Sequence, residues 1–259
     1  MQSYLELLKR VYDFGENATT RNGIRRTAFG AQLRYDLTRG LPLVTTRHIP
    51  TKNPRTEMPW FLRGDTTTEF LHRYGVSIWD ANADKGGNVG KIYGYQWRYG
   101  FGVDQIVRAV AMLKKNPRST RNVVTAWNPV DMDEMALPPC HFAFQLHSDG
   151  KHLTLQFSMR STDLVLGLPT NLAGYAILAH LFAKVTGQKA VELICDLGNI
   201  HIYSDHFDGV AKQLQREPLP LPTLAIMGEV APDLFTVDPH QLLIQNYYSH
   251  PTIKFNMSV

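Results

Sequence analysis

The segment from residue 141 to residue 186 constrains the fold more than any other part of the chain. Between 141 and 161, apolar and polar side chains alternate on both sides of a Ser148-Asp149-Gly150 turn, which is the pattern of a β-hairpin with one buried face. Residues 171–186 are apolar almost all round, so they predict a central helix. A hairpin that buries one face beside such a helix requires a layered domain of helices and strands.

Shorter patterns predict the remaining elements. Helices are expected over 2–14, 56–73, 104–115 and 204–215, and strands over 27–37, 123–127, 189–197 and 201–203, with short strands after the prolines that follow residue 217. No internal repeat, low-complexity tract or linker is visible. We therefore expect residues 1–259 to form one domain.

Composition limits the class of protein. A length of 259 residues allows a sizeable core, and a net charge of +4 suits anionic ligands but is too small to imply nucleic acid. The two cysteines, Cys140 and Cys195, provide neither a disulfide framework nor a set of metal ligands. No signal peptide and no run of about 18 apolar residues is present. These features predict a cytoplasmic protein with no metal and no membrane span.

Cys140 stands in an unusual context. It follows Pro138-Pro139 and precedes His141 at the start of the hairpin, and Arg160 stands at the predicted end of the second hairpin strand. A fixed cation beside a thiol favours the thiolate, which is the attacking form. Free cysteines are more often buried as small apolar groups, and Cys195 in Leu193-Ile194-Cys195 fits that description. Cys140 is therefore the candidate nucleophile of an enzyme.

Other polar residues near this cysteine have ordinary explanations when taken singly. Asp163 and Asn171 fit a turn and a helix cap, Glu57 fits the first turn of a helix, and His201 and Tyr203 fit a buried strand. Taken together and in this order, they could hold a small anionic substrate over the sulfur of the nucleophile.

The ordered motifs resemble the thymidylate synthase family over nearly the full length. The matching segments are LVTT at 43–46, WFLRGDT at 60–66, IWD at 78–80, YGYQWR at 93–98, AWN at 126–128, LPPCH at 137–141, RS at 160–161 with Asp163, GLP at 167–169 with Asn171, HIYS at 201–204 and HPTIK at 250–254. The resemblance implies an α+β fold with a mixed sheet packed back to back in a homodimer. It also implies a folate-dependent one-carbon transfer to a pyrimidine nucleotide, with 5,10-methylenetetrahydrofolate as co-substrate.

The resemblance also implies roles at the nucleotide. Cys140 would add to pyrimidine C6, and Arg160 would stabilise the thiolate and hold the 5′-phosphate. The same resemblance assigns further phosphate ligands (Ser161, Arg21 and the partner subunit's Arg121), a base-reading amide (Asn171) and ligands of the sugar hydroxyl (His201 and Tyr203).

For proton transfer and folate binding, the resemblance implies a second group of residues. Glu57 would order water and move protons, while Tyr93 and His141 would assist loss of the C5 proton. Folate would contact Ile78, Trp79, Asp163, Leu166 and Gly167, and the carboxyl terminus at Val259 would close over the site.

Several positions depart from the synthase pattern. Met159, Thr170 and Asn199 replace Gln, Phe and Asp, the segment 23–27 lacks its usual Thr-Gly repeats, and Thr120 replaces the first arginine of a pair. The Met-Arg-Ser-x-Asp pattern at 159–163, the polar Thr170 and the His-x-Tyr-Ser-x-His-Phe pattern at 201–207 resemble the phage-type nucleotide hydroxymethylases of the same family. Because Thr170 removes an apolar wall and adds a hydroxyl, we expect water rather than hydride to reach the C5 methylene.

Three alternatives stay open. Trp79, His141 and the Met257-Ser258-Val259 ending match the synthases, which make dTMP. Asn171 suits uracil, so dUMP is the expected substrate, whereas dCMP or a ribonucleotide is the alternative. A basic patch for RNA is a third, non-enzymatic possibility, formed by Arg21, Arg25, Arg26, Arg118 and Arg121. It would leave Cys140 without a role, so nucleic acid is not the expected partner.

Overall fold

The computed structural model describes residues 1–20 and 23–256. The helices are α1 (Gln2–Phe14), α2 (Lys52–Arg63), α3 (Glu69–Arg73), α4 (Tyr93–Arg98), α5 (Gln105–Lys115), α6 (Gly167–Thr186) and α7 (Phe207–Leu214). The strands are β1 (Glu16–Thr20), β2 (Gly23–Asp36), β3 (Val123–Thr125), β4 (His141–Ser148), β5 (His152–Asp163), β6 (Lys189–Tyr203), β7 (Thr223–Ile226) and β8 (Leu242–Gln245). Short 3-10 helices cover Pro129–Glu134, Ser204–His206 and Pro239–Gln241.

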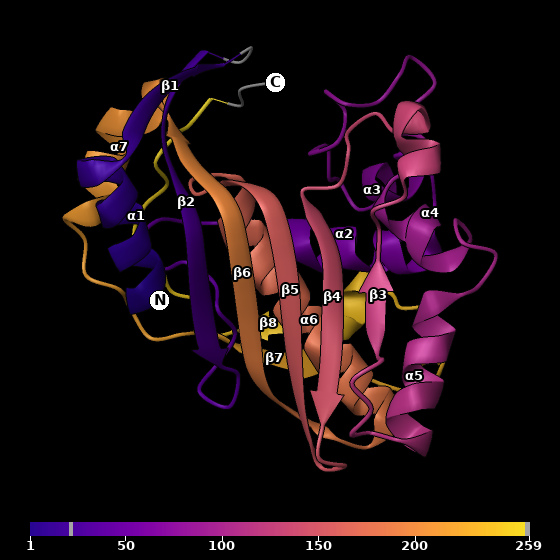
Figure 1. Cartoon of the computed structure of the whole chain (residues 1–259). Coiled ribbons are helices and arrows are strands. Elements are labelled where there is room, and N and C mark those ends of the chain that lie inside the picture. Colours follow the sequence, from indigo (N-terminus) through magenta and orange to yellow (C-terminus); the bar gives the residue numbers. More distant parts are fainter. Residues whose placement is uncertain (21–22, 257–259) are drawn as a thin grey trace.

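A mixed sheet of six strands forms the centre of the fold. Its order is β1-β2-β6-β5-β4-β3, and β7 and β8 form a separate pair. The pair β5 and β6 is parallel and the others are antiparallel. A parallel pair needs a crossover, which α6 supplies. Figure 1 shows α6 behind the sheet, with no helix across the front face. The α+β architecture predicted above is confirmed.

The helix α6 is as central as its sequence predicts. Its residues from Leu172 to Ala179 are all buried, and Tyr175 stacks on Phe157 of β5 with ring centroids 4.0 Å apart. A helix that buries every face must have neighbours on all sides, and α2 supplies the second layer by packing against it. This packing brings α2 and the start of α6 to the same end of the sheet.

The sheet bends where β2, β5 and β6 pass one another at Gly198. The register runs from Leu197 to Asn199 against both neighbours without a ladder partner for Gly198. A Cβ at this glycine would lie 3.1 Å from the carbonyl oxygen of Arg160, so any larger residue would press on β5 and glycine favours this close approach. Beyond this point, Ser161 lies opposite Asn199, and Asp163 opposite His201.

Two predicted helices and one strand boundary differ from the structure. The helix predicted over 56–73 is two helices, because Gly64 adopts a left-handed φ of 72° and ends α2. Its partner after the break is α3, and Trp60 donates from Nε1 to the Thr67 carbonyl, at 2.8 Å, to fold the connection. The helix predicted over 204–215 begins as a 3-10 turn. The two strands predicted over 189–197 and 201–203 are one continuous strand.

Two expectations about polar residues were also wrong. Asn171 is not a helix cap, because α6 begins four residues earlier, at Gly167. Arg160 does not end its strand, since β5 continues to Asp163. Both errors come from reading a polar residue as the end of an element. In the structure, the Asn171 amide therefore lies on the helix surface, where it can face a ligand.

Candidate active site

A cavity of about 410 Å³ opens between α2, the segment after α3 and the first turns of α6. Its walls combine an apolar surface with amides and two carboxyl groups. The lining residues are Arg47, Ile49, Pro50, Asn53, Glu57, Ile78, Trp79, Asn82, Leu137, Asp163, Leu166, Gly167, Thr170 and Asn171. Seven of the predicted site residues are in this set: Glu57, Ile78, Trp79, Asp163, Leu166, Gly167 and Asn171.

Glu57 is a buried acid on the cavity wall. It stands in the middle of α2 rather than in its first turn, and only 8% of it is exposed. Burial raises its pKa from 4.5 to about 7, although the indole N–H of Trp79 donates to its Oε1 at 2.8 Å and acts in the opposite direction. A carboxyl group with a pKa near 7 can both give and take a proton at neutral pH.

Cys140 is not a lining residue, but it is tied to the cavity through Tyr93, whose ring meets that of the lining residue Trp79 edge to face at 5.8 Å. The Cys140 amide donates to the Tyr93 hydroxyl at 2.8 Å. Arg160 donates from Nε to the Pro139 carbonyl at 2.9 Å and from Nη2 to the Pro138 carbonyl at 2.7 Å. The guanidinium therefore braces the segment that presents the thiol.

Opposing effects act on the pKa of the Cys140 thiol. Burial raises the pKa of Cys140, while the positive charge of Arg160 and a hydrogen bond with Tyr93 lower it. Arg160 lowers the pKa of Cys140, as predicted. In the chain without a substrate, however, burial raises this pKa by more than Arg160 lowers it. A proton acceptor or a further positive charge next to the sulfur must supply the remaining activation.

His141 is buried with its ring stacked on Tyr93, at 4.0 Å between centroids and 22° between planes. Its Nδ1 lies 2.9 Å from the Tyr175 hydroxyl. Burial lowers the pKa of His141 to about 3, so the imidazole is neutral at pH 7. A neutral, enclosed ring is suited to positioning Tyr93 rather than to carrying a proton.

Asp163 joins the cavity to the bent end of the sheet. Burial raises the pKa of its carboxyl group, and the hydrogen bond from the Val165 amide, at 2.8 Å, opposes that rise. Arg47, which is only 5% exposed, also lines the cavity and donates to the Val165 carbonyl. The carboxyl group is thus oriented by backbone amides with its other oxygen available to a ligand.

Three of the predicted sugar and phosphate ligands, Ser161, His201 and Tyr203, lie on β5 and β6 beyond Gly198. His201 is 3% exposed, and its pKa is lowered to about 4 by burial and by the charge of Arg25. Its ring meets that of Tyr203 edge to face at 5.1 Å. Ser161 follows Arg160 on β5, opposite Asn199. These residues are next to Asp163 but do not line the cavity itself.

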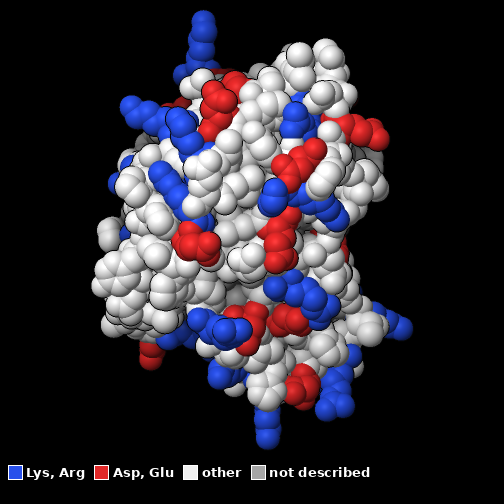
Figure 2. All heavy atoms as spheres, turned by 90° about the vertical axis from the view of Figure 1, so that its left-hand side faces the viewer, with Lys and Arg blue, Asp and Glu red and all other residues white. Residues whose placement is uncertain are grey.

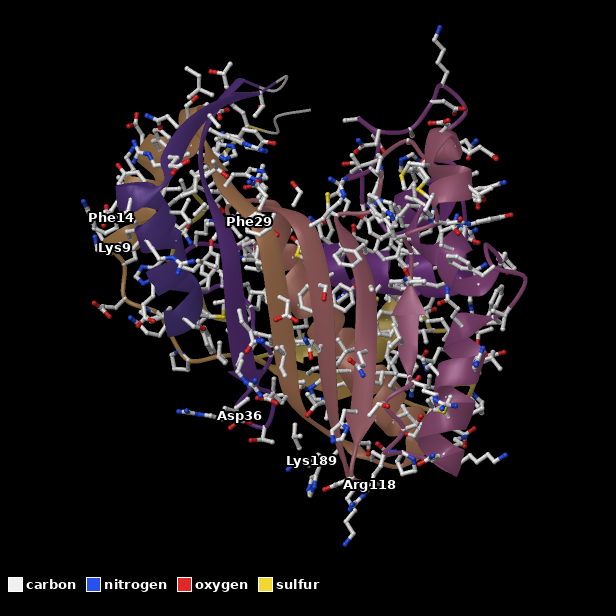
Figure 3. The ribbon with its side chains drawn as sticks, in the orientation of Figure 1. Lys9, Phe14, Phe29, Asp36, Arg118 and Lys189 are labelled. Atoms are coloured by element: carbon white, nitrogen blue, oxygen red, sulfur yellow. The ribbon has the colours of Figure 1, made fainter. Side chains whose placement is uncertain are left out.

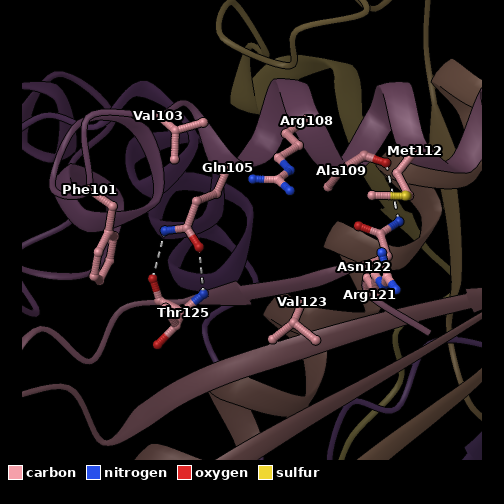
Figure 4. A pocket seen from close by; sticks show the side chains of 10 residues that line it. All are labelled: Phe101, Val103, Gln105, Arg108, Ala109, Met112, Arg121, Asn122, Val123 and Thr125. Carbon is pink, nitrogen blue, oxygen red and sulfur yellow. Dashed lines mark hydrogen bonds between the residues drawn. The ribbon is translucent and has the colours of Figure 1, made fainter. Parts of the chain in front are cut away.

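Arg121, a predicted phosphate ligand, is not brought to this cavity. Arg121 lies with Arg108 on a different hollow of about 260 Å³, between α5 and β3 (Figure 4). No residue is shared between the two cavities. Arg21 and Val259 lie outside the described residues.

Six lining residues escaped the sequence interpretation: Arg47, Ile49, Pro50, Asn53, Asn82 and Leu137. Arg47, Asn53 and Asn82 occur in polar segments that carry no motif, and Leu137 was assigned only to the motif around Cys140. No local signal distinguishes these residues from ordinary loop and helix positions. Their role depends on how α2 and the segment after α3 meet α6.

Groups of acidic, histidine and cysteine side chains that could hold a metal are absent from the described residues. In the same part of the chain, no helix is both long and apolar enough to cross a membrane. Acidic and basic side chains are interspersed on the face shown in Figure 2, which offers no broad basic surface to a nucleic-acid backbone.

The arrangement places a braced cysteine, a buried acid and the Asn171 amide at one end of a mixed sheet. A family model described as thymidylate synthase matches residues 2–259. The chain belongs to the thymidylate synthase family. It is therefore a folate-dependent one-carbon transferase whose co-substrate is methylenetetrahydrofolate. Members of the thymidylate synthase family act as homodimers on nucleotide and folate substrates.

The cavity is suited to a folate. Ile78, Trp79 and Leu166 give an apolar surface for a flat ring, and Asp163 offers an acceptor for ring N–H groups. The folate supplies a one-carbon unit at the oxidation level of formaldehyde.

Proposed function

We propose that this member of the thymidylate synthase family transfers a hydroxymethyl group to C5 of dUMP. The observation that carries the proposal is the position of Thr170, which lines the folate cavity one residue before Asn171. Its hydroxyl has no hydrogen-bond partner among the described residues, so it is available to hold a water molecule. A hydroxyl at this point makes the wall polar where the resemblance implies a phenyl ring in synthases.

The covalent step uses Cys140. Its thiolate forms a bond to pyrimidine C6, which makes C5 nucleophilic, and C5 then takes up the one-carbon unit. Loss of the C5 proton and departure of the folate leave an exocyclic methylene on C5. Water held at Thr170 adds to that methylene, and the Cys140–C6 bond breaks with release of the thiolate. The products are 5-hydroxymethyl-dUMP and tetrahydrofolate, so no electron transfer is needed.

Proton movements fall to Glu57 through water, because its pKa of about 7 allows it to act in both directions at neutral pH. Tyr93, whose pKa burial raises well above 10, stays protonated and orients the Cys140 segment. We assign His141 to packing against Tyr93, since its ring is neutral.

Base choice is assigned to Asn171. One amide can donate to the uracil 4-carbonyl and accept from N3–H at the same time, and its side chain lines the cavity from the second turn of α6. The sugar hydroxyl is assigned to His201 and Tyr203. The 5′-phosphate is assigned to Arg160 and Ser161, with Arg21 and the partner subunit's Arg121.

The partner is proposed to pack on the open face of the sheet. Below the bend, this face carries polar groups that are uncharged or paired. Gln156 donates to Asp196, and Arg34 forms an ion pair with Glu192. Phe29, labelled in Figure 3, is 84% exposed near the bend. A sheet face without a covering layer is a common dimer surface, and an exposed phenyl ring gains by burial there.

Reductive methylation of dUMP to dTMP is the second candidate, and the buried residues Trp79 and His141 favour it because both match the synthase pattern. Thr170→Phe separates the two. If the proposal holds, the variant forms 5-hydroxymethyl-dUMP more slowly and some dTMP in its place, as measured by mass spectrometry of the nucleotides. Thr170→Ser, which keeps the hydroxyl, is the control. An unchanged product in Thr170→Phe would remove Thr170 as the determinant.

A further inference from the structure

A chain of three hydrogen bonds joins β2 to β6 at the sugar end of the site. Thr27 donates from Oγ1 to the carbonyl of Ile200 at 3.1 Å. Asn199 donates from Nδ2 to Thr27 Oγ1 at 2.7 Å, and its Oδ1 lies 3.0 Å from Nδ1 of His201. Thr27 and His201 are direct partners in the β2–β6 ladder, so the chain is anchored in the sheet at both ends.

Only one arrangement of protons satisfies this chain. The carbonyl of Ile200 can only accept, so the Thr27 hydroxyl uses its single proton there and must accept from its other neighbour. That neighbour is then the NH₂ group of Asn199, which fixes the orientation of the amide. The amide oxygen consequently faces Nδ1 of His201 and can only accept, so Nδ1 carries the proton.

The charge state of the ring completes the argument. Burial and the charge of Arg25 hold the pKa of His201 near 4, so the ring is neutral at pH 7. A neutral imidazole with a proton on Nδ1 has a bare Nε2 that can only accept. Among the described residues, Nε2 has no hydrogen-bond partner.

We propose that Thr27 and Asn199 are positioning residues that hold His201 in its Nδ1–H form, so that Nε2 accepts a hydrogen bond from the 3′-hydroxyl of the nucleotide. The inference rests on the proposed nucleotide substrate. It adds a requirement to that proposal, because the substrate must present a hydrogen-bond donor at this position. A sugar that carries only an acceptor there leaves two lone pairs facing each other.

The proton position can be measured without any substrate. Two-bond ¹H–¹⁵N correlation spectra of ¹⁵N-histidine-labelled protein at neutral pH distinguish the two neutral forms, and His201→Gln assigns the signals. We expect the native protein in the Nδ1–H form. Thr27→Val should introduce the Nε2–H form, because the Asn199 amide is then free to turn. The double variant Thr27→Val/Asn199→Asp should restore the Nδ1–H form, since a carboxylate can only accept.

Thr162→Val is the matched control. Thr162 lies in the adjacent strand opposite Ile200, is fully buried, and its Oγ1 has no partner in the described part of the chain. Thr162→Val removes a buried threonine hydroxyl near the same place and leaves the hydrogen bonds among Thr27, Asn199 and His201 intact. Its spectrum should match the native one.

Binding of nucleotide analogues tests the consequence. Native protein should bind dUMP roughly tenfold more tightly than the 3′-fluoro analogue, the loss expected for one mispaired hydrogen bond. It should bind the 3′-amino analogue, which retains a donor, about as well as dUMP. Thr27→Val should lose most of the preference for dUMP over the fluoro analogue, and the double variant should regain it.

The outcomes separate this inference from the proposed function. A native ring in the Nε2–H form, or equal binding of dUMP and the fluoro analogue, would overturn the inference while the nucleotide substrate stood. Failure to bind any pyrimidine nucleotide would remove the proposed function and the sugar contact with it.

Discussion

The Sγ atom of Cys140 carries the covalent step of the proposed reaction, so it gives the simplest residue-scale prediction. Cys140→Ala should reduce turnover of dUMP by at least about 10³-fold. Binding of dUMP should stay close to native, because the phosphate and base ligands are other residues. Cys195→Ala is the control, since Cys195 is fully buried in the core and should affect stability alone. Near-native turnover by Cys140→Ala would exclude the covalent route.

The raised pKa of Glu57 makes the free energy of unfolding depend on pH. Its pKa rises from 4.5 to about 7 on folding, so between these values the folded state binds more protons than the unfolded state. The free energy of unfolding therefore falls as the pH rises through this window. Glu57→Gln removes the effect, so the stability of the variant relative to native should increase by on the order of 2–3 kcal/mol between about pH 4 and about pH 8.

Urea denaturation of both proteins at the two pH values measures the difference. Glu69→Gln is the matched control, because its side chain is 78% exposed on α3. A stability difference between native and Glu57→Gln that does not change with pH would mean that Glu57 ionises normally in the folded protein.

At the scale of elements, the sequence predicts which segments are helices and strands better than it predicts where they end. The alternation of 141–161 and the uniform apolarity of 171–186 led to β4, β5 and α6, because core packing imposes these periods directly. The break at Gly64 was missed, since a single glycine within an apolar helical pattern does not reveal its φ angle. Asn171 and Arg160 were misplaced because polar residues that serve a ligand resemble those that end elements.

The sequence predicts only some of the residues that line the cavity. Trp79 and Asp163 fall within motifs and Glu57 lies just before one, whereas Asn53 and Asn82 become neighbours only after α2 and the segment beyond α3 pack on α6. Long-range packing has no signature in a short window of sequence. The resemblance supplied roles for the motif residues but could supply none for the others.

The close approach of β5 to β6 gives a prediction at the same scale. Gly198→Ala would place a Cβ 3.1 Å from the Arg160 carbonyl oxygen and 3.2 Å from that of Met159, so the strands must separate. We expect a loss of roughly 1–3 kcal/mol in the free energy of unfolding. We also expect a fall in kcat, because Arg160 and Ser161 move with β5. Gly86→Ala, in an exposed loop, is the control. Native kcat and stability in Gly198→Ala would show that this approach is not required.

For the whole molecule, the proposed dimer makes each site depend on both subunits. Arg121 lines a hollow that shares no residue with the cavity of its own chain, and it is proposed to act in the partner's site. Cys140→Ala and Arg121→Ala should each be nearly inactive alone. After the two are mixed and allowed to exchange subunits, half of the dimers should carry one complete site, which restores about a quarter of native activity. No recovery after verified exchange would place Arg121 outside the partner's site.

The identity of the product tests the central claim most directly. Native protein is incubated with dUMP and 5,10-methylenetetrahydrofolate, and both the nucleotide and the folate are identified by mass spectrometry. The proposal predicts 5-hydroxymethyl-dUMP with an equal amount of tetrahydrofolate, because water adds to the C5 methylene at Thr170. Equal amounts of dTMP and dihydrofolate would contradict it and establish reductive methylation.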